Sequence, residues 1–455
     1  MRSLFFAVSL LTAATVAAQG EVHEFSLDNG MKVVVKEDHR APIVVSQVWY
    51  KVGSSYEPDG VTGVSHVLEH MMFKGTDSHP PGEFSRIISA NGGDENAFTG
   101  RDYTAYYQKL SADRLEVSFE LEADRMRNLT LPEEEFAKEL EVVKEERRLR
   151  TEDKPTSLTY EQFNALAYSS LPYGNPVIGW MNDLDNMEVS DLRDWYRLWY
   201  APNNATLVVV GDVQFQEVRK LAEKYFGPLK TENTPRTKPL REPPQRGLVR
   251  SVVKAPAKEP YLIMGYKTPV LNSTDDEWEA YALEMLVAIL DGGDSARFSR
   301  NLVRGQEIAV SAGASYSAFS RLPGMLVVDG TPAKGRNMQE LEKALLGEIE
   351  RIKGEQVSQQ ELDRVKAQVV AEQIYDLDSV YYQAMQLGVL ETIGLGWQLL
   401  DQYVDKIKAV TPEQVQAVAK KYLNKDQLTV TVLEPLPISN EQAAKAAMQG
   451  GGHGR

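Results

Sequence analysis

His66-Val67-Leu68-Glu69-His70 is the stretch of this chain that carries the most information. It places two of the six histidines four residues apart, with a glutamate beside the second. On an α-helix, residues i and i+4 lie on the same face, so His66 and His70 would present their imidazoles to one ion. Neutral imidazole binds zinc at about 2.0–2.1 Å. Glu69 would lie within reach of a water on that ion, where a carboxylate acts as a general base.

Apolar residues surround this motif, which indicates a largely buried helix. They are Val64, Val67, Leu68, Met71, Met72 and Phe73. A buried imidazole needs a polar partner, and a metal ion is one such partner. The alternative is a pair of surface histidines on an amphipathic helix. The order of the residues is the reverse of the His-Glu-x-x-His zinc motif and is the inverted zincin signature.

A catalytic zinc site takes three protein ligands and leaves a fourth position open. The acidic segment 131–150 is the best source of the third ligand. Glu139 and Glu146 are seven residues apart, so they fall two helical turns apart on nearly the same face. Glu141 and Glu145 fall on a different stripe. Spacing alone does not decide which of these carboxylates reaches the metal.

The stretch from His66 through Glu146 resembles the pitrilysin/insulinase family of zinc peptidases, and especially its half-length branch that contains mitochondrial processing peptidase. In that family the inverted motif is followed, about seventy-five residues later, by a glutamate in an E-x-x-V-x-x-x-E context, which residues 139–146 match. The resemblance implies that His66, His70 and Glu146 are the zinc ligands. It also implies that Glu139 contacts these ligands without binding the metal itself.

Residues 91–99 and the aromatic segment 103–107 are similar to the substrate-binding edge strand of that family. The resemblance implies that Asn96, Ala97 and Phe98 contact substrate. A strand at the edge of a sheet can pair with an extended peptide through its backbone, which agrees with this role. The alternative is an ordinary hairpin with aromatic cross-strand pairs.

The chain is organised as a tandem repeat around the proline-rich segment 230–247. The first half ends with a helix pattern and then an apolar strand over 205–210, and the second half ends in the same way with a strand over 427–432. Ser190 and Thr411 are the expected N-caps of the two helices.

Near the front of each half, strand patterns come in pairs, over 31–36 with 43–52 and over 248–253 with 261–266. Strands followed by helices, repeated once, predict an α+β fold of two homologous domains, each a mainly antiparallel sheet packed with helices. The predicted division is a signal peptide over 1–18, a zinc-binding domain over 19–229, a linker over 230–247, a homologous domain without metal over 248–436, and a tail over 437–455.

The composition narrows the classes of function. The 455 residues are 42% hydrophobic and 25% charged, as in globular proteins of two or more domains. A net charge of −15, without a Lys/Arg cluster interleaved with aromatic residues, argues against a nucleic-acid surface. The chain has no cysteine, which excludes disulfides, thiolate ligands and a cysteine nucleophile.

The N-terminus is typical of a secretory signal. Residues 4–18 are apolar but too few to span a bilayer, and Val16-Ala17-Ala18 precedes Gln19 as a cleavage site would. We therefore predict a periplasmic or secreted protein, with a retained signal anchor as the alternative. No later segment is long and apolar enough to cross a membrane.

The second half departs from the family pattern at two places. Tyr281-Ala282-Leu283-Glu284-Met285 aligns with the motif and lacks both histidines, so we expect one zinc ion per chain. Active members of the family also carry an Arg and a Tyr seven residues apart, and the aligned positions here are Val303 and Val310. Arg304 would take the first position only if the register slipped by one, which would put Ser311 in place of the Tyr.

These observations predict a zinc-dependent endopeptidase that hydrolyses peptides or unstructured polypeptides. Since half-length relatives divide the zinc and the Arg/Tyr pair between two subunits, the resemblance implies the zinc-bearing subunit of a heterodimer, with a homodimer as the alternative. A non-catalytic scaffold subunit of the same fold and a purely structural zinc protein are the rival hypotheses.

Overall fold

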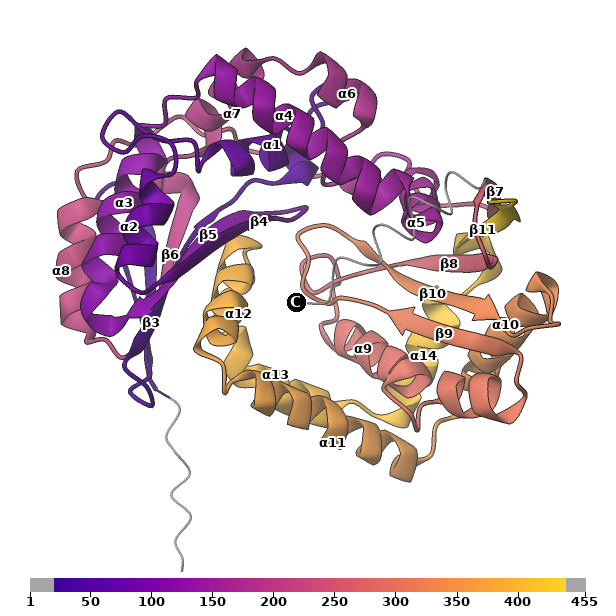
Figure 1. Ribbon diagram of the computed structural model, residues 1–455. Coiled ribbons are helices and arrows are strands. Elements are labelled where there is room, and N and C mark those ends of the chain that lie inside the picture. The colour runs from indigo at the N-terminus through magenta and orange to yellow at the C-terminus, as the bar shows by residue number, and fades with distance from the viewer. Residues whose placement is uncertain (1–19, 439–455) are drawn as a thin grey trace, which may run out of the picture.

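The computed structural model describes residues 20–438. The predicted signal peptide and nearly all of the predicted tail therefore lie outside the described residues. The chain forms two halves, each a sheet covered by helices, that lie opposite each other (Figure 1). No helix within residues 20–438 is long and apolar enough to span a membrane.

The first half is built on a six-stranded sheet in the order β1-β2-β6-β3-β5-β4. Its strands are β1 (Val22–Ser26), β2 (Lys32–Glu37), β3 (Ile43–Tyr50), β4 (Asp94–Thr99), β5 (Thr104–Ser111) and β6 (Ala205–Gly211). Its helices are α1 (Val64–Met71), α2 (Glu83–Ala90), α3 (Leu115–Arg127), α4 (Glu133–Arg147), α5 (Pro155–Ala167), α6 (Met181–Asn186), α7 (Val189–Trp199) and α8 (Phe215–Tyr225).

The second half is built on a five-stranded sheet in the order β7-β11-β8-β10-β9. Its strands are β7 (Val249–Pro256), β8 (Tyr261–Thr268), β9 (Ala309–Ser315), β10 (Gly324–Pro332) and β11 (Leu428–Leu436). Its helices are α9 (Trp278–Asp291), α10 (Met338–Gly354), α11 (Gln359–Asp376), α12 (Val380–Thr392), α13 (Leu399–Ala409) and α14 (Pro412–Tyr422).

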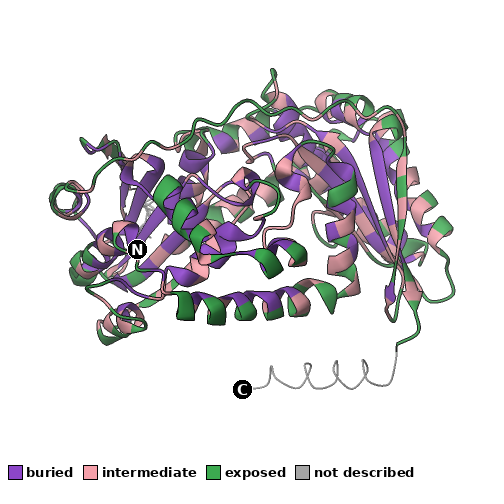
Figure 2. Ribbon diagram, turned by 90° about the horizontal axis from the view of Figure 1, so that it is seen from above, coloured by how far each residue is buried: buried purple, intermediate pink, exposed green. Residues whose placement is uncertain are grey.

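The two sheets have the same plan, apart from the extra edge strand β1. In each, one pair of neighbours is parallel (β2 with β6, β7 with β11) and the other pairs are antiparallel. The prediction of an α+β fold with two mainly antiparallel sheets is confirmed. Figure 2 shows that buried residues concentrate on the strands and on the inner sides of the helices.

The strands predicted at the front of each half are present, and they are not neighbours in the sheets. The last strand of each half inserts between them: β6 lies between β2 and β3, and β11 lies between β7 and β8. Every residue of β6 is buried. A strand buried on both faces belongs in the middle of a sheet, which explains why the chain returns to the centre.

The two predicted helix caps differ in outcome. Thr411 caps α14, since its side chain accepts a hydrogen bond from the backbone N–H of Gln414 at 3.3 Å. Ser190 does not cap α7, because that helix begins at Val189. Glu188 is the N-cap, and its backbone N–H donates to Asp191 Oδ2 at 2.8 Å.

The halves exchange one helix each. Helix α5 of the first half packs on the second sheet, where Phe163 lies in one apolar cluster with Ile263 and Val327. Helix α12 of the second half packs on β3 and β6, where Leu387 lies in one cluster with Trp49. Figure 1 shows both helices against the sheet of the opposite half.

A buried polar contact also joins the halves. Arg321, on the loop between β9 and β10, donates from Nε to Asp102 Oδ1 at 3.2 Å and from Nη2 to Ser55 Oγ at 2.7 Å. Its guanidinium lies 4.1 Å from the centre of the Tyr56 ring. Asp102 is 6% exposed and also accepts a hydrogen bond from the Tyr173 hydroxyl. The two halves are therefore held by charge as well as by apolar packing.

Candidate metal centre

Helix α1 carries the His-x-x-Glu-His motif, and its start is fixed by two features. Gly63 has φ of 89°, and a Cβ there would lie 2.6 Å from the carbonyl oxygen of Ile178, so only glycine fits. The Glu57 carboxylate accepts the backbone N–H groups of Gly63 at 2.7 Å and Ser65 at 2.8 Å. These contacts satisfy two N–H groups at the start of the helix.

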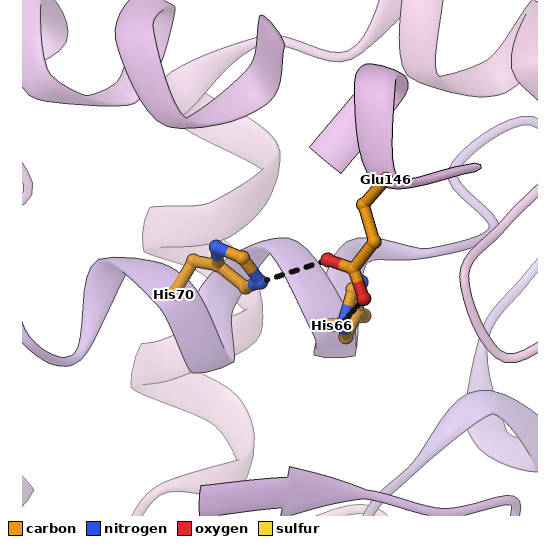
Figure 3. Close-up of side chains that lie close together, drawn as sticks. All are labelled: His66, His70 and Glu146. Atoms are coloured by element: carbon orange, nitrogen blue, oxygen red, sulfur yellow. Dashed lines mark ion pairs between the residues drawn. The ribbon is translucent and has the colours of Figure 1, made fainter. Parts of the chain in front are cut away.

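The histidines lie one turn apart on this helix, as the spacing predicts. His66 is 9% exposed, and its ring centre is 4.9 Å from that of His70. Helix α4 brings Glu146 to the same place, with Oε1 at 3.9 Å from His66 Nε2 and Oε2 at 3.5 Å from His70 Nε2 (Figure 3).

The donor set fits a zinc ion. Ligand atoms at zinc bond lengths of about 2.0–2.1 Å in a tetrahedron lie roughly 3.4 Å from each other. The ligand atoms of His66, His70 and Glu146 all lie within 4.8 Å of one another. Within residues 20–438, this is the one group of three or more such side chains with that geometry.

Of the other candidate carboxylates on α4, Glu139 contacts the metal group, whereas Glu141 and Glu145 do not, as their spacing indicates. Glu139 Oε2 lies 3.1 Å from His70 Nδ1, and Glu139 Oε1 lies 2.6 Å from Lys74 Nζ. A carboxylate accepts, so Nδ1 carries the proton and Nε2 is free to bind a metal. Glu141 and Glu145 are 66% and 58% exposed and pair with lysine and arginine neighbours outside the cleft.

Burial and the neighbouring charges shift the pKa values of these groups. Burial lowers the pKa of His66 to about 4, with His70 acting in the same direction, so His66 is a neutral imidazole at physiological pH. Burial also opposes the charged form of His70, but hydrogen bonds with Glu146 and Glu139 outweigh it and raise its pKa. The hydrogen bond with His70 is the main reason that the pKa of Glu146 is lowered.

Glu69 lies on the same helix, turned toward strand β4. Its Oε2 accepts a hydrogen bond from Thr99 Oγ1 at 2.5 Å. Burial raises the pKa of Glu69. A carboxyl group with a raised pKa beside a metal site exchanges protons more readily near neutral pH, as general acid–base catalysis requires.

These groups open onto a cleft of about 920 Å³. The motif and β4 both line the cleft, and Tyr261 of the second half lines it as well. The predicted substrate-binding residues Asn96, Ala97 and Phe98 all line it, on the edge strand of the sheet. The Phe98 ring packs on Trp49, with ring centres 5.3 Å apart. At Phe98, therefore, it is the backbone of the strand rather than the aromatic ring that is available to a substrate.

The corresponding helix of the second half holds no such group. Tyr281 and Met285 are buried in the core around α9. Burial raises the pKa of Glu284, which lies between them, to about 7. Val303, Arg304 and Val310 do not line the cleft, and Val310 is 58% exposed on β9.

Two arginines in the cleft were not expected from the sequence. Arg150 lies in a π-helical turn after α4, and its Nη1 is 2.5 Å from Glu146 Oε1. Its position four residues after Glu146 is the signal that would have found it. Arg101 follows β4 and has no local sequence signal.

Two imidazoles and a carboxylate around an open position, with a second carboxylate beside them, are typical of metal-dependent hydrolases. Comparison with known families agrees. Residues 32–180 match the model described as Insulinase (Peptidase family M16), and residues 186–369 match the model described as Peptidase M16 inactive domain. The chain belongs to the insulinase family, peptidase family M16.

Individual relatives support this membership. The zinc protease PqqE of Helicobacter pylori is 33% identical over 90% of this chain and 92% of that protein. A crystal structure of a protease from Helicobacter pylori matches with a TM-score of 0.86 and 31% identity, covering 91% of this chain and all of that one. The periplasmic protease PqqL of Escherichia coli has the same fold, with a TM-score of 0.77 at 19% identity, and this chain covers 51% of it.

Proposed function

We propose that this chain is a zinc-dependent endopeptidase that hydrolyses peptides or unstructured polypeptides. The observation that carries the proposal is the convergence of His66, His70 and Glu146 in one cleft, with Glu69 and the edge strand β4 beside them. The name of the relative PqqE, a zinc protease, supports the choice of metal.

Different residues of the chain would bind the metal, bind the substrate and transfer the proton. His66, His70 and Glu146 would hold one zinc ion, and Glu139 would keep His70 in the tautomer that binds it. When bound, zinc acidifies water and polarises the scissile carbonyl. An extended substrate would pair with the edge of β4, near Asn96, Ala97 and Phe98. Glu69 would take the proton from the attacking water and return it to the leaving amine.

The chain is further proposed to be the zinc-bearing subunit of a heterodimer, with a homodimer as the alternative. The positions aligned with the family's Arg/Tyr pair hold Val303 and Val310, neither of which donates a side-chain hydrogen bond. A partner of similar length would supply the donors that stabilise the transition state. The signal-like N-terminus and the similarity to a periplasmic protease support a periplasmic or secreted location.

Glu69→Gln tests the proposal. We expect the variant to keep one zinc ion per chain, measured by mass spectrometry of bound metal, and to lose at least about 100-fold in peptide cleavage. Glu145→Gln, an exposed change on α4, is the matched control and should leave cleavage unchanged. Substantial turnover by Glu69→Gln would remove Glu69 from this role.

A non-catalytic subunit of the same fold is the second candidate, favoured by Val303 and Val310. Incubation of the zinc-loaded chain with a mixture of unstructured peptides separates the two functions. Chelator-sensitive cleavage by the chain alone would show that it needs no partner. A chain that binds zinc but cleaves nothing, either alone or with a co-purified family member, would be the scaffold.

A further inference from the structure

We infer that the cleft selects peptide segments that carry acidic residues near the scissile bond, and that Arg101 and Arg150 are the residues that determine this specificity. The inference rests on the proposed function, because it concerns the substrate of the same cleft. Arg101 and Arg150 are the two lysine or arginine side chains among the described residues that line it.

Arg101 is positioned by two contacts, one of its side chain and one of its backbone. Its guanidinium lies 5.1 Å from the centre of the Tyr173 ring. Its backbone carbonyl accepts the N–H of Ser55 at 2.7 Å, next to the contact that joins the halves. Within residues 20–438, no carboxylate lies within 4.0 Å of its side-chain nitrogens. A guanidinium that packs near an aromatic ring and has no internal acidic partner is well placed to bind a carboxylate of a ligand.

Arg150 lies beside the metal group. It contacts Glu146 Oε1 and is still 71% exposed. A guanidinium has five donors, so one contact with Glu146 leaves most of them available. Arg148, two residues earlier, pairs with Glu145 outside the cleft and does not line it.

The acidic side chains of the cleft are all engaged within the protein. Glu146 belongs to the metal group, and Glu69 accepts the hydroxyl of Thr99. Glu161 is 6% exposed at its side chain and is bridged by Arg147 through contacts of 2.8 and 3.0 Å. The charges free to meet a substrate are therefore positive, although the chain as a whole carries −15. A cleft with a charge opposite to the rest of the surface selects its ligand locally.

The position of Arg101 predicts where the acidic residue lies. The contact between Thr99 and Glu69 marks where the catalytic carboxylate stands along β4. Arg101 is two residues further along the chain, in the turn that joins β4 to β5. An extended substrate paired with β4 would therefore meet Arg101 beyond the end of that strand, where an acidic side chain near the scissile bond would pair with it.

Peptide binding to zinc-loaded Glu69→Gln tests this without turnover. The probes are three labelled peptides of one extended sequence, with Glu, Gln or Lys at the positions flanking the centre, followed by fluorescence anisotropy. We expect the Glu peptide to bind about fivefold more tightly than the Gln peptide and the Lys peptide to bind most weakly, with differences that shrink at high salt. Equal binding of all three, or no binding, would overturn the inference.

Variants of the arginines complete the test. Arg101→Gln should weaken the Glu peptide about fivefold and leave the Gln peptide unchanged, while Arg101→Lys should keep the preference. Arg150→Gln, with its zinc content measured, should act in the same direction. Arg148→Gln is the matched control and should change nothing. An Arg101→Gln variant that weakened all three peptides equally would show a structural role and contradict the inference.

Turnover by the wild-type chain distinguishes this failure from that of the proposed function. A chain that binds the Glu peptide preferentially but cleaves no peptide, either alone or with a co-purified family member, would refute the peptidase proposal and leave the specificity in place. A chain that cleaves the three peptides with equal kcat/KM would support the peptidase and refute the specificity.

Discussion

At the scale of single residues, the metal group depends on a carboxylate that does not touch the metal position. Glu139 holds His70 Nδ1 at 3.1 Å and is itself held by Lys74 at 2.6 Å. Such a partner fixes both the tautomer and the direction of the ligand, and losing one typically costs 10–100-fold in metal affinity.

We therefore expect Glu139→Ala to bind zinc about 10–100-fold more weakly, while keeping the fold. Competition with a zinc-binding fluorophore measures this, and circular dichroism checks the fold. Glu141→Ala on the same helix is the control, because Glu141 is 66% exposed and pairs with Lys144. Equal zinc affinities for the two variants would show that Glu139 does not orient His70.

Glu284 gives the second half a pH-dependent stability. Burial raises its pKa to about 7 in the folded protein, against about 4.5 when unfolded. The folded state therefore holds the proton more tightly, so its stability falls as the pH rises from about 4.5 through 7. Glu284→Gln stays neutral and should be more stable than wild type at pH 8, by on the order of 1–3 kcal/mol, but not at pH 4.5.

Calorimetric melting of Glu284→Gln at both pH values measures this difference. Glu259→Gln, an exposed change between β7 and β8, is the control. A stabilisation by Glu284→Gln that is the same at both pH values would contradict the pH dependence.

Much of the site was predictable, because its residues are specified locally. The spacing of His66 and His70 is a helical repeat, and Glu139 and Glu146 share a face of one helix. The choice of Glu146 needed family resemblance, since spacing left several carboxylates open. Arg101 was not predictable from local patterns, because it reaches the cleft through a turn and through packing on Tyr173, which is distant in sequence.

At the scale of elements, the exchanged helices make close contacts that only glycine allows. A Cβ on Gly388 of α12 would lie 2.0 Å from Cε2 of the buried Trp49 ring. A Cβ on Gly265 of β8 would lie 2.5 Å from Cζ of Phe163 on α5. Each helix therefore approaches the opposite sheet at a glycine that leaves room for an aromatic ring.

Gly388→Ala should lower stability by about 1–3 kcal/mol, because the added methyl group would displace Trp49 or the helix. Thermal unfolding followed by circular dichroism measures the loss. Gly347→Ala in α10 is the control, since nothing lies within 4 Å of its new Cβ. The control should be neutral or stabilising by up to about 1 kcal/mol. A Gly388→Ala protein as stable as wild type would mean that the contact relaxes freely.

The existence and type of the elements followed from periodicity, but their neighbours did not. The terminal strands of both halves and the cap at Thr411 were predicted from their own residues. The insertion of β6 between β2 and β3 depends on pairing over more than 150 residues, for which a local pattern has no signal. Ser190 was a misleading signal, because the N-cap of the same helix is Glu188, two residues earlier, which forms a capping box with Asp191.

At the scale of the whole molecule, the halves are joined in three ways. The proline-rich segment between α8 and β7 connects them covalently, α5 and α12 are exchanged, and Arg321 pairs with the buried Asp102. Breaking a buried pair of this kind by removing one partner costs several kcal/mol, since the other charge stays buried. The covalent connection is thus only one of the bonds between the halves.

Because the halves exchange helices, we expect them to stay associated after the chain is cut between them. A single protease cut within 230–247, where no helix or strand is assigned, would leave each fragment with a helix seated on the other. We expect the two fragments to co-elute in gel filtration at the size of the intact chain, and to separate only in denaturant. Fragments that part in native buffer would contradict this. Each fragment carries a helix that covers the sheet of the other fragment, so neither fragment is expected to fold as an independent unit. The two fragments would restore the cleft only by folding together.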